Sequence, residues 1–299
     1  IDVIFPPAAM GAIIAVIGLE LAPVAANMAG LTGDNINMVN VAISMFTLAV
    51  GVIGSVAFRG FMSIIPILFG VVCGYVFAAI MGIVNFQPVI DAPWFQVPHF
   101  YAPVFDINAI MIIAPAALVV LAEHIGHLVV TGNIVDRDLI KDPGLSRSLF
   151  ADGLSNVISG FAGATPNTTY GENIGVMAIT KVYSTWVIGG AAVMAIILSF
   201  CGKLSELIHS IPVPVMGGIC ILLFGVIAAS GIRVLVERQV DYSKSSNLVM
   251  TSVIMIIGLS GAKLSFGAFS VQGMVLATVV AIIMSLIFKL FESLHLLNE

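Results

Sequence analysis

The sequence predicts an all-α polytopic membrane protein, and three observations lead to that fold class. Of the 299 residues, 60% are hydrophobic and only 9% are charged, whereas soluble globular chains are about 45–50% apolar and about 25% charged. The mean hydropathy is +1.13. Apolar runs of about 20 residues, the length that crosses a bilayer, recur from one end of the chain to the other. The net charge of -5 says little about partners, and the chain carries no basic patch of the kind that binds nucleic acid.

About ten spans follow one another along the chain. They are expected at about 6–29, 39–57, 62–84, 108–131, 147–163, 171–182, 184–203, 212–232, 246–261 and 271–291. The first opens with Pro6 and Pro7, which a helix tolerates in its first turn. Because the chain starts with Ile1 and not Met, we expect further sequence before it. The runs 147–163 and 171–182 are too short to cross as plain helices.

The positions of the basic residues predict the orientation. If the chain enters from the cytoplasm, both its ends are cytoplasmic and nine of the eleven Lys and Arg residues fall on that side. These are Arg59, Arg137, Lys141, Arg147, Lys181, Arg233, Arg238, Lys244 and Lys289. Lys203 and Lys263 fall outside. The long connection 85–108 has no Lys or Arg, and its Trp94 suits an outer membrane–water interface.

The run "ALVVLAEHIGHLVV", residues 117–130, places ionisable groups inside an expected span. Glu123 and His127 are four residues apart and share a helix face. A charge at the bilayer centre costs at least ~2.5–3.5 kcal/mol, so such residues usually mark a substrate or proton pathway. A simpler interpretation is a protonated Glu123 that hydrogen-bonds to His127 and ties helices together. His124 points away from Glu123, and we expect it to be a packing or hydrogen-bonding residue.

An enzyme is disfavoured by the same residues. The zinc-protease pattern is His-Glu-x-x-His, whereas the order here is Glu-His-x-x-His, with no further ligand candidate close in sequence. No nucleophile stands beside Glu123 and His127, although a Ser or Thr of another span could supply one. We therefore expect neither a metal nor a cofactor.

The segment "GATPNTTYGENIGVMAITK", residues 163–181, predicts a broken membrane element. Gly163 can end one helix, and Pro166 cannot join the middle of another. A new apolar helix then begins at Gly171. Irregular backbone at membrane depth is tolerated only where it is buried in protein or lines a cavity, and in transporters such breaks bind substrate. Alternatively, Glu172 serves only to cap its own helix.

Together, the two sites favour a small neutral ring as the ligand. Glu123 and Glu172 have no obvious cationic partner within the membrane, so an anion would be repelled. Ionised carboxylates accept hydrogen bonds from N–H donors. Backbone N–H groups at Tyr170, Gly171 or Glu172 would donate to carbonyls of the same ligand. The residues alone thus predict a transporter for a small polar ring compound, coupled to protons.

The stretch "ENIGVMAITK" resembles the signature of the nucleobase–ascorbate transporter family: Gln/Glu/Pro, Asn, any residue, Gly, four of any kind, Thr, then Arg/Lys/Gly. The matching positions are Glu172, Asn173, Gly175, Thr180 and Lys181. Three further stretches look like the bacterial members that move uracil with a proton. These are "AEHIGHLVVTGNIVDRDLIKDPG", "ATPNTTYGEN" and "PVMGGICILLFGVIAASGIRVL".

The resemblance implies a fold of fourteen segments in two inverted repeats of seven, in which the third and tenth segments are half strand and half helix. The ten spans then resemble segments 5–14, and the broken element resembles the tenth. Residues 1–103 would be the first part of the gate domain, 104–210 the core domain with the substrate site, and 211–299 the second part of the gate domain. With segments 1–4 expected to lie before residue 1, we do not expect these residues alone to transport.

The resemblance also assigns roles to residues. Glu123 and Glu172 match the carboxylates that hold uracil, and Gly171 and Tyr170 match backbone contacts beside it. Glu123 and His127 match the proton-coupling groups. The implied protein is a homodimeric importer of uracil with a proton in the bacterial inner membrane. The alternatives are a permease for xanthine or another nucleobase, an anion transporter or channel on the same fold, and a sensor that binds a nucleobase without moving it.

Overall fold

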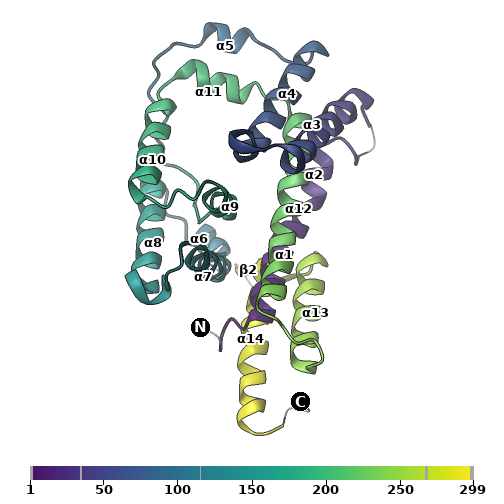
Figure 1. Ribbon diagram of the computed structural model, residues 1–299, viewed down its shortest axis with the longest axis vertical. Coiled ribbons are helices and arrows are strands. Elements are labelled where there is room, and N and C mark those ends of the chain that lie inside the picture. The colour runs from purple at the N-terminus through teal and green to yellow at the C-terminus, as the bar shows by residue number, and fades with distance from the viewer. Residues whose placement is uncertain (1–2, 34–35, 115, 267–268, 297–299) are drawn as a thin grey trace. The chain divides into compact units, whose positions relative to one another are not determined.

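The computed structural model describes residues 3–33, 36–114, 116–266 and 269–296, and most of them are helical (Figure 1). Every expected span coincides with a helix or a pair of helices. The helices are α1 (Pro7–Glu20), α2 (Ala22–Met28), α3 (Met38–Ala57), α4 (Pro66–Ile80), α6 (Ile107–Ile113), α7 (Ala116–Val135), α8 (Leu145–Phe161), α9 (Gly171–Thr180), α10 (Thr185–Ser199), α12 (Val213–Glu237), α13 (Ser245–Leu259) and α14 (Gly273–Ser293). The expected spans 6–29 and 108–131 are each divided in two.

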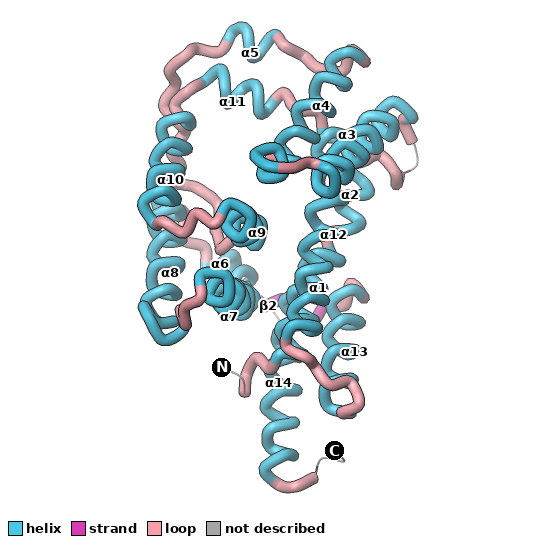
Figure 2. Tube along the Cα trace, viewed as in Figure 1, coloured by secondary structure: helices cyan, strands magenta, loops and turns pink. Residues whose placement is uncertain are grey.

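Several shorter elements lie in the connections (Figure 2). They are the 3-10 helix η1 (Gly60–Ile64), α5 (Gln87–Asp91), the π-helical turn η2 (Ile140–Gly144) and α11 (Gly202–His209). The strands β1 (Lys263–Phe266) and β2 (Phe269–Gln272) pair antiparallel, with Lys263 opposite Gln272. The expectation of an all-α chain is therefore wrong at this hairpin. Polar and apolar residues alternate along both strands, which is the period of a strand and not of a helix.

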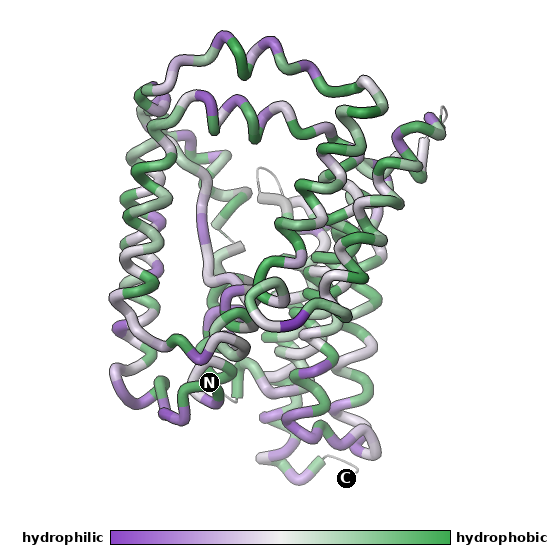
Figure 3. Tube along the Cα trace, turned by 45° about the horizontal axis from the view of Figure 1, so that its top comes forward, coloured by the Kyte–Doolittle hydropathy of each residue, from purple (hydrophilic) through white to green (hydrophobic). Residues whose placement is uncertain are grey.

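Four described helical segments are long and apolar enough to cross a membrane: Pro7–Met28, Met38–Ala57, Val213–Glu237 and Gly273–Ser293. A fifth arises if α10 and α11, which meet at a bend of 89°, are counted as one broken span. Hydrophobic residues dominate the helices, whereas hydrophilic ones gather in the connections and in α5 and α11 (Figure 3). The chain is thus a multi-pass membrane protein, and the count of about ten crossings stays a prediction.

The chain divides into two compact units. Unit 1 consists of residues 1–21, 101–174 and 224–299, and unit 2 of residues 22–100 and 175–223. In unit 1, α1 packs against α13 and α14, α7 contacts α1 and α14, and α8 contacts α7. The centre of this bundle is fully buried at Ile13, Val16 and Ile254. The predicted division into gate and core domains stays a prediction.

Glu20, the last residue of α1, has a hydrogen-bond partner in unit 1. Its carboxylate accepts a hydrogen bond from the backbone N–H of Met274 at 2.7 Å. Met274 lies in the first turn of α14, where N–H groups have no partner within the helix. Gly273 precedes it with φ +54°, and a Cβ there would collide with the Glu20 carboxylate. A half-buried acid at the end of α1 therefore caps α14.

In unit 2, α3 and α4 pack at close range because Gly74 of α4 lies against the buried Thr47 of α3. The long connection before α6 is fixed by Lys203, whose ammonium donates to the carbonyls of Val89 and Ile90 at 3.1 and 3.0 Å. The same ammonium lies 5.6 Å from the centre of the Trp94 ring. Connection 85–108 is thus attached to α11 at its α5 end.

Candidate functional site

Helix α7 carries the ionisable residues that the sequence singled out. Glu123 and His127 are both half-buried, and His124 between them is 4% exposed. The ring of His124 hydrogen-bonds through Nε2 to Ser148 Oγ at 2.7 Å, and its Nδ1 lies 4.0 Å from a carboxylate oxygen of Asp152. Both partners belong to α8. The expectation that His124 is a packing and hydrogen-bonding residue is confirmed, because it attaches α7 to α8.

The predicted break in the chain is present. Helix α8 ends at Phe161, α9 begins at Gly171, and residues 164–170 belong to no helix or strand. Gly163 has φ +83°, and a Cβ on it would lie 2.6–2.7 Å from Tyr101 atoms. Only glycine satisfies both demands, the left-handed backbone and the close approach. Gly163 therefore ends the first helix, as expected, while the strand half of the element has no assigned strand in the described residues.

A hydrogen bond joins α7 to the broken element. His127 Nδ1 lies 2.8 Å from Thr169 Oγ1, across 42 residues of sequence. The other ring nitrogen faces the start of α9, since a Cβ built on Gly171 would lie 3.1 Å from His127 Nε2. The donor in this hydrogen bond is either the ring N–H of His127 or the hydroxyl of Thr169, depending on the tautomer of the ring. His127 and Gly171, assigned to proton coupling and to substrate contact, are thus brought together.

Asn156 of α8 holds the same segment further upstream. Its side-chain amide donates to the carbonyl of Asn167 at 2.9 Å and accepts from the N–H of Asn167 at 2.8 Å. Sequence reasoning missed both Asn156 and Thr169. The available signal was their position, because an amide on one arm of a broken membrane element and a hydroxyl within the break need polar partners.

The remaining predicted residues lie in or beside α9. Tyr170 is 62% exposed, and Asn173 is exposed as well. The Thr180 hydroxyl donates to the Val176 carbonyl, one turn earlier, at 2.9 Å. The side chain of Glu172 and the surroundings of Gly175 lie outside the described residues. Both roles expected for Glu172, contact with substrate and capping of α9, therefore stay predictions.

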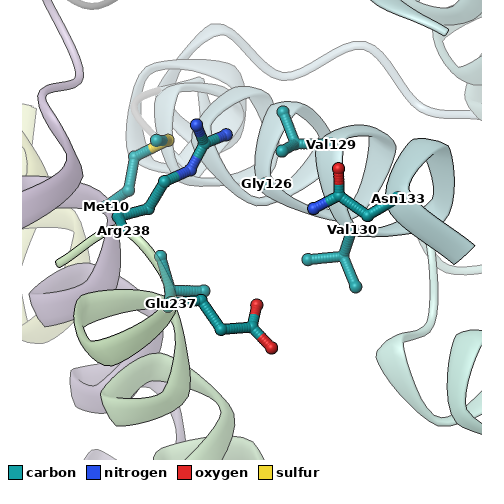
Figure 4. A pocket seen from close by; sticks show the side chains of 8 residues that line it. Met10, Gly126, Val129, Val130, Asn133, Glu237 and Arg238 are labelled. Atoms are coloured by element: carbon teal, nitrogen blue, oxygen red, sulfur yellow. The ribbon is translucent and has the colours of Figure 1, made fainter. Parts of the chain in front are cut away.

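A small cavity of about 130 Å³ lies further along α7. Figure 4 shows Val129, Val130 and Asn133 of α7 on one side of it and Glu237 and Arg238 on the other. None of the predicted substrate or proton residues lines this cavity. The predicted site residues that the structure describes therefore lie at the break between α8 and α9 and on the neighbouring part of α7, apart from this cavity.

The fold and this site define a class: a multi-pass membrane protein in which a broken, polar element meets an ionisable helix. A family model described as "Permease family" matches residues 1–266. The uracil permease of Escherichia coli (strain K12) is 64% identical over 298 residues, which are 99% of this chain and 70% of the relative. The uracil permease of Paenibacillus larvae is 60% identical over 305 residues, 100% of this chain and 72% of the relative. The uracil permease of Bacillus subtilis (strain 168) is 47% identical over 297 residues, which are 95% of this chain and 68% of the relative.

This chain belongs to that permease family, the nucleobase–ascorbate transporters that the signature at residues 172–181 predicted. The similarity extends over essentially the whole chain, so it includes α7, the break and α9 together. The prediction from the motif is confirmed at the level of the family.

Proposed function

We propose that this protein imports uracil across the bacterial inner membrane together with a proton. The observation that carries the proposal is the hydrogen bond between His127 and Thr169, which places an ionisable side chain of α7 at the break before α9. The chain in which it occurs is 64% identical to a protein named uracil permease. A histidine is the side chain best suited to proton exchange near neutral pH.

The chemistry of the ligand matches the residues around the break. Uracil is a planar ring in which two N–H groups alternate with two carbonyls. The carboxylates of Glu123 and Glu172 would accept from the ring N–H groups, and the backbone N–H groups of Tyr170 and Gly171 would donate to a carbonyl. Hydrogen bonds to a charged group contribute about 1.5–3 kcal/mol each, enough to favour such a ring over one without these donors.

Proton coupling follows from the cost of a buried charge. A protonated Glu123 or His127 alters the charge that the site must carry through the membrane interior, so protonation would decide when the substrate-loaded site can move. We further propose that the protein works as a homodimer in the lipid bilayer, with both ends of this chain cytoplasmic. It acts without a cofactor, a metal or an enzymatic step.

Uptake of labelled uracil into proteoliposomes tests the proposal. The full-length protein should accumulate uracil faster at acidic outside pH, and a protonophore should abolish accumulation. Uptake that ignores the proton gradient would refute the coupling, and uptake of xanthine in preference to uracil would favour the purine alternative. An anion that competes with uracil more strongly than a neutral pyrimidine does would favour the anion carrier. Uracil binding without any uptake would favour the sensor.

Two substitutions separate the roles of the carboxylates. Glu123→Gln keeps the shape of the side chain but removes its charge, so proton-driven accumulation should fail while exchange of internal for external uracil survives. Glu172→Ala should abolish uracil binding. If Glu172→Ala bound uracil with near-native affinity, Glu172 would be only the cap of α9.

A further inference from the structure

The backbone of the break is held by one side chain of the preceding helix. The amide of Asn156 forms two hydrogen bonds with the same residue, donating to the carbonyl of Asn167 and accepting from its N–H. A residue of a neighbouring antiparallel strand makes the same reciprocal pair of bonds. Asn156 therefore satisfies Asn167 in the way that a paired strand would.

Such satisfaction is required at this place in the fold. A backbone N–H or carbonyl that is shielded from water without a partner costs free energy, and the membrane interior offers no water to replace one. Residues 164–170 have no helix to supply these partners. The two bonds with Asn156 thus satisfy the N–H and carbonyl of Asn167 and fix the position and direction of the backbone there.

The position of Asn167 connects this clamp to the substrate site. Asn167 lies two residues before Thr169, which hydrogen-bonds to His127, and four before Gly171. The short segment 167–171 is therefore held at one end by α8 through Asn156 and near the other by α7 through His127. Its last two residues are Tyr170 and Gly171, whose backbone is expected to contact the ligand.

We propose that Asn156 is a positioning residue that sets the affinity for uracil by aligning the backbone of residues 167–171. The inference rests on the proposed function, because it takes uracil as the ligand. Asn156 does not have to touch uracil in this role. Its contribution is that the N–H groups at Tyr170 and Gly171 are already oriented when the ring arrives, so that binding does not have to order them.

The surrounding contacts supply a matched control. The Asn167 side chain accepts from Ser155 Oγ at 3.0 Å, separately from the backbone bonds made by Asn156. Ser155→Ala removes that side-chain contact and leaves the clamp intact. Asn156→Ala removes both clamp bonds. Asn156→Asp keeps the acceptor for the Asn167 N–H but places a carboxylate where the donor to the carbonyl was.

The experiment measures equilibrium binding of labelled uracil by the purified full-length protein, and then uptake kinetics in proteoliposomes. Asn156→Ala should raise Kd and KM about tenfold, as expected for the loss of two hydrogen bonds that order the site, while the maximal rate stays within about twofold. Asn156→Asp should raise Kd as well. Ser155→Ala should stay within about twofold of the original protein.

The outcomes distinguish this inference from the proposed function. If the unaltered protein binds no uracil, the proposed function fails and the inference with it. If the unaltered protein binds uracil, and both Asn156→Ala and Asn156→Asp bind it as tightly as the unaltered protein does, only the inference fails. A lowered maximal rate with unchanged KM would make Asn156 a merely structural residue. An equal loss in Ser155→Ala would assign the effect to the side-chain contact between Ser155 and Asn167. Should Asn156→Ala not fold, the Kd of Asn156→Asp decides.

Discussion

His127 Nδ1 and Thr169 Oγ1 lie 2.8 Å apart and join α7 to the break between α8 and α9. We expect this bond to be part of the substrate site. His127→Ala and Thr169→Val should each weaken uracil binding, and the double variant should lose less than the sum of the two. The coupling should be about 1 kcal/mol, within the range of residues in direct contact.

Thr278→Val is the matched control for this double-mutant cycle. The hydroxyl of Thr278 donates within its own helix, α14, to the Met274 carbonyl at 2.8 Å, so its removal should change uracil binding little. Additive losses in the cycle would mean that the two side chains act independently.

We expect a side chain added at Gly171 to crowd the imidazole of His127. A Cβ at Gly171 would lie 3.1 Å from His127 Nε2, so Gly171→Ala should displace the ring and weaken uracil binding. In a protein that already carries His127→Ala, the added methyl group should cause little further loss, because the crowded side chain is gone. Binding assays of the four combinations measure this. Gly153→Ala in α8 is the control, since a Cβ there meets nothing within 4 Å. Equal losses in both backgrounds would contradict the steric account.

Removal of the cap that Glu20 provides for α14 should lower the stability of the protein without a specific loss of uracil binding. Glu20→Ala removes the acceptor for the Met274 N–H and should lower the free energy of unfolding by about 1 kcal/mol. Gly273→Ala should destabilise more, since it adds strain at φ +54° and a collision with the Glu20 carboxylate. Thermal unfolding of the purified protein checks both. The control is Glu292→Ala, which removes an exposed ion pair with Lys289 and should be near neutral. A Glu20→Ala variant as stable as that control would refute the cap.

We expect Asp241, in the connection between α12 and α13, to make a contribution to stability that is lost in acid. The hydrogen bond from the Ser243 hydroxyl, at 2.6 Å, lowers the pKa of Asp241 below its ordinary value of 3.8, and the Ser243 N–H adds to the effect. Since the pKa is lower in the folded state, this stabilisation is present above about pH 4 and is lost as the pH falls through the folded-state pKa.

Ser243→Ala tests the connection. The gap in thermal stability between the original protein and Ser243→Ala should be constant from about pH 5 to 8 and should narrow below about pH 4. A gap that widens in acid would contradict this assignment. Because Asp241 does not titrate near neutral pH, it should leave the pH dependence of transport between pH 5 and 8 unchanged.

Much of the fold could be predicted, because hydropathy and helix length act over whole segments. The run expected at 246–261 is α13 (Ser245–Leu259), and the run expected at 271–291 is α14 (Gly273–Ser293). The hairpin of β1 and β2 was missed because each strand has only four residues. So short an alternation is hard to recognise between two apolar helices. The break after Glu20 was also missed, although Pro23 in the first turn of α2 marks where a new helix can begin.

The site was predictable only in its parts. The break at Gly163, the helix start at Gly171 and the position of His127 on α7 follow from local chemistry. The partner of His127 does not, because residues 164–170 have no regular period that would set which side chains face α7. The same reason hid the clamp between Asn156 and Asn167. Helical spacing shows which residues share a face, but it does not show where an irregular segment passes.

The cap that Glu20 provides for α14 also has a consequence for how the chain is made. The two ends of this hydrogen bond are 254 residues apart in sequence. The ribosome therefore releases α1, with its acid at the C-terminal end, long before the N–H group of Met274 exists. During that interval Glu20 depends on water, lipid headgroups or the insertion machinery. Unit 1 acquires this contact only after Met274 has been synthesised, so a nascent chain stalled before α14 should expose Glu20 to solvent-borne reagents.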